Sequence, residues 1–217
     1  MISRVYADMR FGLRECGVAG VLAATICLSL SAQSSPQQQG QPNPSPHDAK
    51  GGIVAMPADR AEDSYAIYSR LMPGKTLASL PSAQGGVWAI AGVTMNEADR
   101  NPQVPPQGQL KPPPDNPKAF GEALGDYETN RYARVRLEKK GFHLDHAFEL
   151  VNPDTAKSSG YPGVTYFSEV YFDGKHQAAL VYMYEWCANL CAAGTWVYLE
   201  KHGGQWQRES GIVRPGA

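Results

Sequence analysis

The chain has 217 residues, of which 42% are hydrophobic, and its formal net charge is −1. This length and composition suit one globular domain with a sizeable core and exclude a wholly disordered chain. The near-neutral charge, without a basic run interleaved with aromatic residues, argues against nucleic acid as a partner.

The N-terminal residues have the layout of a secretory signal peptide. Three arginines precede an uncharged run over residues 16–32, and small residues follow. We expect residues 1–32 to be removed, which leaves a periplasmic or secreted protein without a membrane span. An uncleaved anchor is the alternative, although the run is short for one. A lipoprotein signal would need a small residue before Cys27, where Ile26 stands.

The next segment, residues 33–49, is rich in Gln, Pro and Ser and has almost nothing to bury. This composition predicts a disordered linker. A single domain would then cover residues 50–217.

Two elements are expected in the first part of this domain. Residues 57–72 place apolar side chains at helical spacing and end before Pro73, which predicts an amphipathic helix. Residues 86–95 are uncharged and bounded by Gly and Asn, which indicates a buried strand. Residues 101–117 contain seven prolines. We expect this loop to be a surface excursion that forms neither a helix nor a central strand.

A second helix is predicted over residues 117–130, opened by its proline. The basic segment at residues 131–140 is interpreted as a solvated face paired with Glu128 and Glu138, with an anion site as the alternative. Residues 142–151 fit either a strand or a helix, and we favour a strand.

The chain is organised around residues 164–213, whose alternating apolar residues and tight turns predict an antiparallel meander of about four strands. Asp173-Gly174 is typical of a two-residue hairpin loop. The strand at residues 177–187 is apolar on both faces, which indicates a central strand. The two-residue loop predicts four strand pairs: Phe172 with Lys175, Val170 with Gln177, Glu169 with Ala178 and Phe167 with Leu180.

Two cysteines remain after the leader is removed, Cys187 and Cys191, and they flank a three-residue turn. In an exported protein this pair predicts a disulfide that closes the hairpin and stabilises the fold by about 2 kcal/mol. Metal ligation or redox activity is the alternative, but the spacing is not that of a C-x-x-C motif.

The order of elements is helix, strand, helix, strand and then a run of antiparallel strands. This order predicts the α+β class. We expect the helices to pack on one face of the sheet.

The last third of the chain resembles a pattern found in uncharacterised exported bacterial proteins, and the likeness covers roughly residues 65–208. It implies a C-terminal antiparallel sheet, a C-x3-C hairpin and export, and it carries no known activity. The matching residues are Phe167-Ser168-Glu169-Val170, Phe172, Ala179-Leu180-Val181-Tyr182, Cys187, Cys191, Gly194-Thr195, Leu199-Glu200-Lys201, Gly204 and Trp206.

The densest cluster of ionisable residues is formed by His143, Asp145, His146 and Glu149. Its spacing matches no familiar metal motif. Structural or surface histidines are therefore the preferred interpretation, and a metal or acid–base site is the alternative.

A second candidate follows from the predicted strand pairs. They make His176 a diagonal neighbour of Glu169 and place Tyr171 opposite His176. Such a trio can orient a histidine as a base, although an exposed cross-strand pair is the commoner arrangement.

Aromatic residues are dense late in the chain. If Tyr182, Tyr184 and Trp186 share an uncovered face with Trp196, they form a platform of the kind that binds sugars, peptides or proteins. Packing in the core is the alternative.

No catalytic or cofactor motif is present in the sequence. We therefore expect a non-catalytic binding or interaction module of the bacterial cell envelope, without metal or cofactor, whose partner is a protein, a peptide or a glycan. The alternative is a small periplasmic hydrolase or metal-dependent enzyme that uses the cluster at residues 143–149 with Glu169 and His176.

Overall fold

The structure is a computed structural model that describes residues 52–72, 87–101, 103–158, 160–161, 163–187, 191–210 and 212–213. The predicted leader and linker lie outside these residues. Within them, no helix has the length and apolar character that a membrane crossing requires.

The helices and strands follow one another in an order close to the predicted one. The two long helices and the strand before the proline-rich segment lie where the sequence indicates, whereas only the last four residues of the 142–151 segment form a strand. The elements are β1 (Ile53–Ala55), α1 (Ala58–Leu71), β2 (Trp88–Ala91), η2 (Glu97–Asp99), α3 (Pro106–Gln109), α4 (Pro117–Asn130), β3 (Arg134–Arg136), η3 (Lys139–Gly141), β4 (Phe148–Val151), η4 (Ala156–Ser158), β5 (Val164–Phe167), β6 (Tyr171–Phe172), β7 (Ala178–Cys187), β8 (Cys191–His202) and β9 (Gln205–Arg208).

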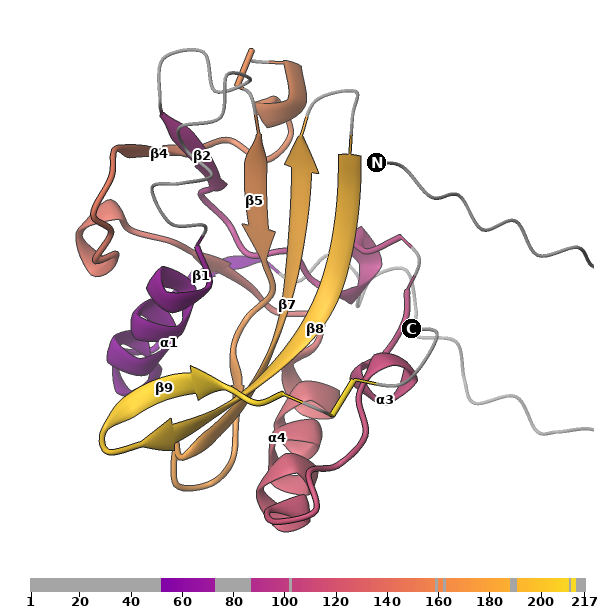
Figure 1. Cartoon of the computed structure of the whole chain (residues 1–217). Helices are drawn as coiled ribbons and strands as arrows, with labels where there is room; N and C mark the ends of the chain where they lie inside the picture. Colours follow the sequence, from indigo (N-terminus) through magenta and orange to yellow (C-terminus); the bar gives the residue numbers. More distant parts are fainter. Residues whose placement is uncertain are drawn as a thin grey trace, which may run out of the picture. The chain divides into compact units, whose positions relative to one another are not determined.

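The main sheet has seven strands in the order β4-β2-β5-β7-β8-β9, with β6 also paired to β7 (Figure 1). Strands β7, β8 and β9 form the predicted antiparallel meander. Strand β2 instead runs parallel to both of its neighbours, β4 and β5, so the sheet as a whole is mixed. A separate parallel pair is formed by β1 and β3.

The two long helices pack on opposite faces of the sheet, so the prediction that helices cover one face is wrong. Tyr68 of α1 belongs to the same buried cluster as Val181. Phe120 of α4 belongs to a second cluster that contains Leu180. Because adjacent residues of a strand point to opposite faces, these two clusters lie on the two sides of β7. A strand that is apolar on both faces requires cover on both.

The loop between β6 and β7 is wider than the predicted two-residue turn, and Phe172 lies opposite Ala179. The Asp173 carboxylate accepts two backbone N–H groups from the far end of the loop, at 2.6 and 2.7 Å. His176, rather than a glycine, takes the left-handed backbone conformation, with φ at 52°. The predicted pairs Phe172 with Lys175, Val170 with Gln177, Glu169 with Ala178 and Phe167 with Leu180 are therefore wrong.

A bulge separates β5 from β6. Phe167 lies opposite Met183, and Tyr171 lies opposite Leu180, so residues 168–170 hold one residue more than the facing strand. The Ser168 hydroxyl accepts the backbone N–H of Tyr182 at 2.9 Å and thus replaces a missing ladder bond.

The proline-rich segment lies at the surface, where most of its described residues are exposed, but it contains the short helix α3. The prediction that it forms no helix is therefore wrong. Pro106 is the first helical residue, where the missing N–H costs no hydrogen bond. Gln109 accepts the backbone N–H of Trp196 at 2.8 Å, and the Val104 carbonyl accepts the Trp196 indole N–H at 2.8 Å. The segment thereby buries Trp196 and satisfies its polar groups.

Cys187 and Cys191 lie directly opposite each other in the β7–β8 ladder. This register is compatible with the predicted disulfide, which remains a prediction. The three residues of the turn between them lie outside the described residues.

Candidate functional site

A cavity of about 950 Å³ lies at the carboxyl ends of β2 and β4. Residues 92–95 follow β2 and residues 152–154 follow β4, and both groups line this cavity. Because the two strands are parallel neighbours, their carboxyl ends meet at one edge of the sheet, which is where ligands commonly bind in sheets with parallel strands.

One wall of this cavity is built from Tyr166, Tyr182 and Tyr184, and we call the space the tyrosine cavity. Tyr166 of β5 lies opposite Tyr184 of β7, with 5.7 Å between the ring centroids. Tyr182 is two residues from Tyr184 and therefore points to the same face. All three residues line one space, with Tyr166 and Tyr182 largely buried behind it and Tyr184 half-buried. An aromatic wall of this kind suits ring-bearing ligands.

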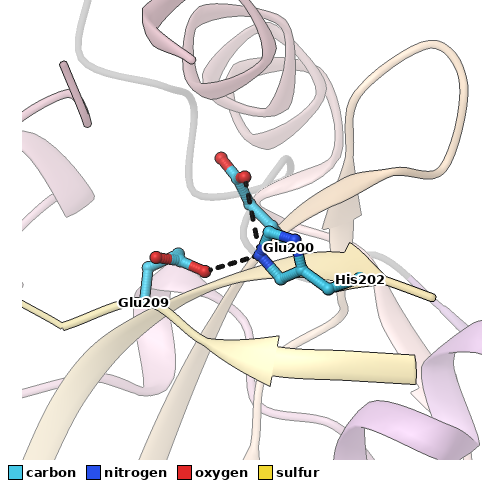
Figure 2. Close-up of side chains that lie close together, drawn as sticks. All are labelled: Glu200, His202 and Glu209. Carbon is cyan, nitrogen blue, oxygen red and sulfur yellow. Dashed lines mark hydrogen bonds and ion pairs between the residues drawn. The ribbon is translucent and has the colours of Figure 1, made fainter. Parts of the chain in front are cut away.

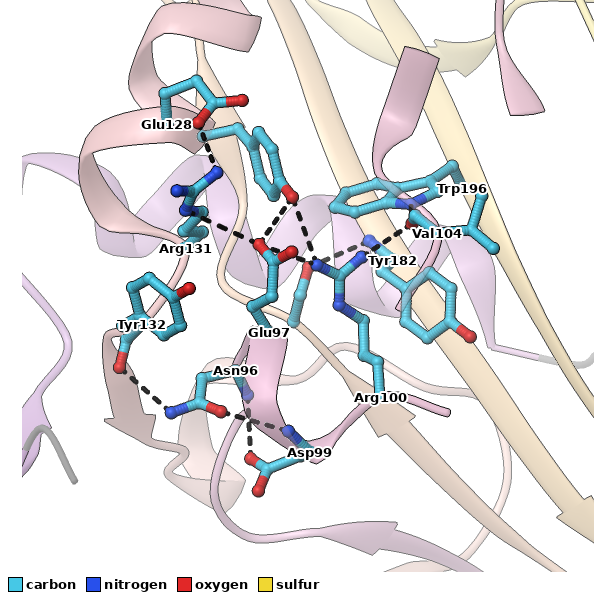
Figure 3. Close-up of polar contacts among 12 residues, drawn as sticks. Asn96, Glu97, Asp99, Arg100, Val104, Glu128, Arg131, Tyr132, Tyr182 and Trp196 are labelled. Carbon is cyan, nitrogen blue, oxygen red and sulfur yellow. Dashed lines mark hydrogen bonds and ion pairs between the residues drawn. The ribbon is translucent and has the colours of Figure 1, made fainter. Parts of the chain in front are cut away.

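Tyr182 is held in this wall by Gly194 and Arg100. A side-chain carbon at Gly194 would lie 1.8 Å from the Tyr182 hydroxyl oxygen, so only glycine leaves room for the ring. On its other side, the guanidinium carbon of Arg100 lies 5.3 Å from the Tyr182 ring centroid and 4.9 Å from that of Trp196 (Figure 3). These contacts fix the ring in place.

Arg100 is buried and fully engaged (Figure 3). It forms an ion pair with Glu97 at 3.1 Å and donates to the Tyr127 hydroxyl at 3.2 Å and to the Val104 carbonyl at 3.0 Å. The Tyr127 hydroxyl donates in turn to Glu97 at 2.6 Å. Burial, and then the hydrogen bond to Glu97, raise the pKa of Tyr127 to about 12, so it remains a neutral donor. The network rigidifies the segment beside the cavity.

The turn that enters this network is capped by Asn96. Its side-chain oxygen accepts the N–H of Asp99 at 3.2 Å, and the Asp99 carboxylate accepts the Asn96 N–H at 2.9 Å. Asp99 also pairs with Arg134. Both charged residues line the cavity, and the pairing neutralises one against the other.

Three further charged residues line the tyrosine cavity: Arg136, Lys157 and Asp154. The Lys157 ammonium lies 5.9 Å from the ring centroid of Tyr166 and 5.5 Å from that of Tyr184. In the described part of the chain, no carboxylate forms an ion pair with Arg136 or Lys157. Two cations against one anion leave the cavity with an excess positive charge.

The Tyr166 hydroxyl is buried and has no hydrogen-bond partner among the described residues. Burial is the main cause that raises the pKa of Tyr166, and Tyr184 and Asp154 raise it further. The hydroxyl therefore stays a neutral donor at physiological pH. A buried donor without an acceptor is costly, and in native proteins such groups often have a functional role.

The predicted aromatic platform is only partly present. Tyr182 and Tyr184 line the tyrosine cavity. Trp196 is 1% exposed and lies beneath the proline-rich segment, so it offers no open surface. Trp186 is half-buried against the core and does not line the cavity.

The histidine cluster is not part of this cavity. His146 bonds its neighbour Asp145 at 2.9 Å, and His143 is exposed. Glu149 accepts the hydroxyl of Tyr161. No hydrogen bond or ion pair among the described residues joins His143 or His146 to Glu169 or His176.

The predicted pair of Glu169 and His176 is not formed either. Glu169 lies in the bulge, 3.5 Å from Arg60, and His176 lies 3.5 Å from Asp63. The His176 ring also stacks on Phe172 at 4.4 Å. Burial raises the pKa of Glu169 to about 7 and outweighs the attraction of Arg60. Glu169 does not line the tyrosine cavity.

A third cluster contains Glu200, His202 and Glu209 on the β8–β9 hairpin (Figure 2). The His202 ring nitrogen lies 2.9 Å from Glu209 and 3.9 Å from Glu200. Each side chain can offer one ligand atom to a metal ion. The histidine already has Glu209 as a hydrogen-bond partner, and it is half exposed, at 52%.

Comparisons of the chain with protein-family models, with curated proteins and with solved structures gave no significant match. The site must therefore be interpreted from its own geometry.

Sequence reasoning missed most residues of the tyrosine cavity. Tyr166 lies in the alternating pattern of the predicted meander without a signal of its own, and Lys157 stands in loop sequence without a motif. The alternation of Tyr182 and Tyr184 on one strand was the usable signal, and the predicted pairing of β5 with β7 was wrong, so it did not place Tyr166 opposite Tyr184.

Proposed function

We propose that the protein is a non-catalytic binding module that takes a small organic ligand in the tyrosine cavity. The observation that carries the proposal is the cavity itself: about 950 Å³ walled by three tyrosines at the carboxyl ends of parallel strands. Small-molecule sites typically have volumes of roughly 300–1,000 Å³, with aromatic walls and a few polar groups.

The arrangement favours binding over catalysis. Among the described residues, burial raises the pKa of two carboxyl groups, that of Glu169 to about 7 and that of Glu185, and neither residue lines the cavity. The histidines of the enzyme hypothesis contact other residues and do not line the cavity. The expected export, by signal peptide, would place this binding module in the periplasm or outside the cell.

Nuclear magnetic resonance on the full chain with labelled tyrosines tests the proposal. The probes are benzoate, benzamide, glucuronate, glucose and a dipeptide, and the readout is the shift of Tyr166, Tyr182 and Tyr184. We expect at least one probe to shift these three resonances together in a saturable way. If none of the three tyrosine resonances shifts with any probe up to millimolar concentrations, the proposed ligand site in this cavity is wrong.

A matched pair of variants ties the signal to the site. Gly194→Ala drives the Tyr182 hydroxyl from its position, because the new carbon would lie 1.8 Å from it. We expect binding to weaken by about tenfold, the effect of an ångström-scale misplacement of a site group. Gly121→Ala is the control, since a side chain there meets no atom within 4 Å. Equal affinity in both variants would place the ligand elsewhere.

A further inference from the structure

The charges around the tyrosine cavity match an anion with one negative charge. Arg134 is neutralised by Asp99. Of the remaining lining charges, Arg136 and Lys157 are positive and Asp154 is negative. The difference is one positive charge, which a single carboxylate balances, whereas a phosphate monoester carries about −1.5 to −2 at pH 7.

Two hydrogen-bond donors of the cavity residues have no acceptor within the described residues. They are the hydroxyl of Tyr166 and the Nε–H of Arg134, and both are buried. Tyr166 is 7% exposed. An anion can supply acceptors to such donors, and hydrogen bonds to a charged group are the stronger kind.

Lys157 is a cation that lies against the tyrosine wall of the cavity. It is exposed, and its ammonium lies over the rings of Tyr166 and Tyr184. Long lysine side chains change rotamer easily on the surface. A ligand that enters can therefore displace the ammonium from the rings and form an ion pair with it.

We propose that the ligand is a ring-bearing organic carboxylate, with its ring on the tyrosine wall and its carboxylate between the Lys157 ammonium and the Tyr166 hydroxyl. This inference rests on the proposed binding function. The ring faces the aromatic surfaces of Tyr182 and Tyr184, and the carboxylate replaces the missing acceptor.

Titration calorimetry and tyrosine-resolved resonance on the full chain test this chemistry with matched probes. Benzoate and benzamide have nearly the same shape, but only benzoate is charged. Glucuronate and glucose form a second, similar pair of a charged and a neutral probe. We expect the charged member of at least one pair to bind about tenfold more tightly, because a charged hydrogen bond replaces a neutral one. Phenyl phosphate should bind no more tightly than benzoate.

Two variants separate the roles of the two contacts. Lys157→Gln should reduce benzoate affinity to the level of benzamide and leave benzamide unchanged. Lys139→Gln is the matched control, because Lys139 also lies over an aromatic ring, that of Phe148, but does not line the cavity. Tyr166→Phe should weaken both probes, and benzoate more than benzamide, because the hydrogen bond that benzoate loses is made to a charged acceptor.

The outcomes distinguish the inference from the binding function on which it rests. Neutral probes that shift the cavity tyrosines as strongly as the charged ones leave the binding function standing and overturn the carboxylate. Tighter binding of phenyl phosphate overturns the single charge. Equal losses of benzoate affinity in Lys157→Gln and Lys139→Gln overturn the position of the anion. A cavity that no probe enters overturns the binding function and the inference together.

Discussion

The two faces of β7 are built from one run of ten residues and end in different environments. On one face, Ala179 and Val181 are fully buried in the cluster that contains α1. On the other face, Leu180 is fully buried in the cluster that contains α4, but two residues later the tyrosines begin and the cavity opens. Over residues 179–181 the first face is thus sealed, whereas the second face borders the cavity from Tyr182 on. From Met183 on, both faces are half-buried.

The difference shows what a helix does for a sheet in this protein. Helix α4 contacts β6 and β7, and its Phe120 shares a buried cluster with Leu180, near the start of β7. Where its cover ends, the chain supplies Arg100 and the Asn96 turn instead, and these polar groups hold tyrosines rather than aliphatic residues (Figure 3). A site therefore forms where apolar cover gives way to a polar network, and the sealed face contributes stability.

The largest expected effect on stability comes from truncating one aromatic side chain on each face of the sheet. Phe167→Ala removes a ring that is fully buried and stacks on Tyr68 at 4.7 Å. We expect a loss of about 3–5 kcal/mol in the free energy of unfolding. Tyr184→Ala, at the open cavity, should cost only about 1 kcal/mol, because its ring is half-buried. Urea denaturation of both variants measures the contrast, and equal losses would contradict two different faces.

A second prediction concerns Glu169, whose pKa is raised from 4.5 to about 7. The folded protein binds this proton more tightly than the unfolded chain does, so the contribution of Glu169 to stability is greatest below about pH 4.5 and falls as the pH rises to about 7. This group alone should remove on the order of 3 kcal/mol over that range, as an upper limit. Above pH 7 its contribution is constant.

The variant Glu169→Gln tests this dependence, because the amide keeps the shape and can still accept from Arg60. We expect a flatter pH profile of unfolding and a more stable protein at pH 8. Glu62→Gln is the control, since Glu62 is an exposed carboxylate on α1. A Glu169→Gln protein that is less stable than the parent at pH 8 would mean that Arg60 outweighs the burial.

A third prediction lies at the far end of β7, where Cys187 faces Cys191. If the disulfide forms, the double variant with serine at both positions should lose about 2 kcal/mol, because the closed loop is short. Intact mass before and after alkylation reports the bond directly. Two free thiols in the protein under oxidising conditions would contradict the predicted disulfide.

The sequence was sufficient for the elements and for the central strand, and much less so for their pairing. The residues of α4 were predicted correctly because Pro117 fixes the start and the apolar spacing is regular. The ion pairs of Arg131 with Glu128 and Lys140 with Glu138 were also expected. Both results depend on residues that are close in the sequence.

The rest depends on contacts between distant residues. The bulge at residues 168–170 and the wide loop at Asp173 shift the register, and nothing local to the Asp173-Gly174 pair indicates either feature. The parallel pairing of β2 with β4 and β5 follows from crossovers that strand patterns do not encode. The tyrosine cavity is formed by that pairing, so the residues that line it could not be predicted from the sequence.

The smallest expected effect on stability comes from removing a single tyrosine hydroxyl from each face of the sheet. Tyr166→Phe removes a buried hydroxyl without a partner among the described residues, so the free energy of unfolding should stay the same or rise by about 1 kcal/mol. A comparable hydroxyl on the sealed face is that of Tyr68, which donates to the Ser168 carbonyl at 2.9 Å. Tyr68→Phe should therefore destabilise the protein by about 1 kcal/mol or more. Thermal denaturation of the two variants measures this difference: we expect Tyr68→Phe to lose stability and Tyr166→Phe to keep or gain it. A loss of stability in Tyr166→Phe would mean that its hydroxyl already has a hydrogen-bond partner.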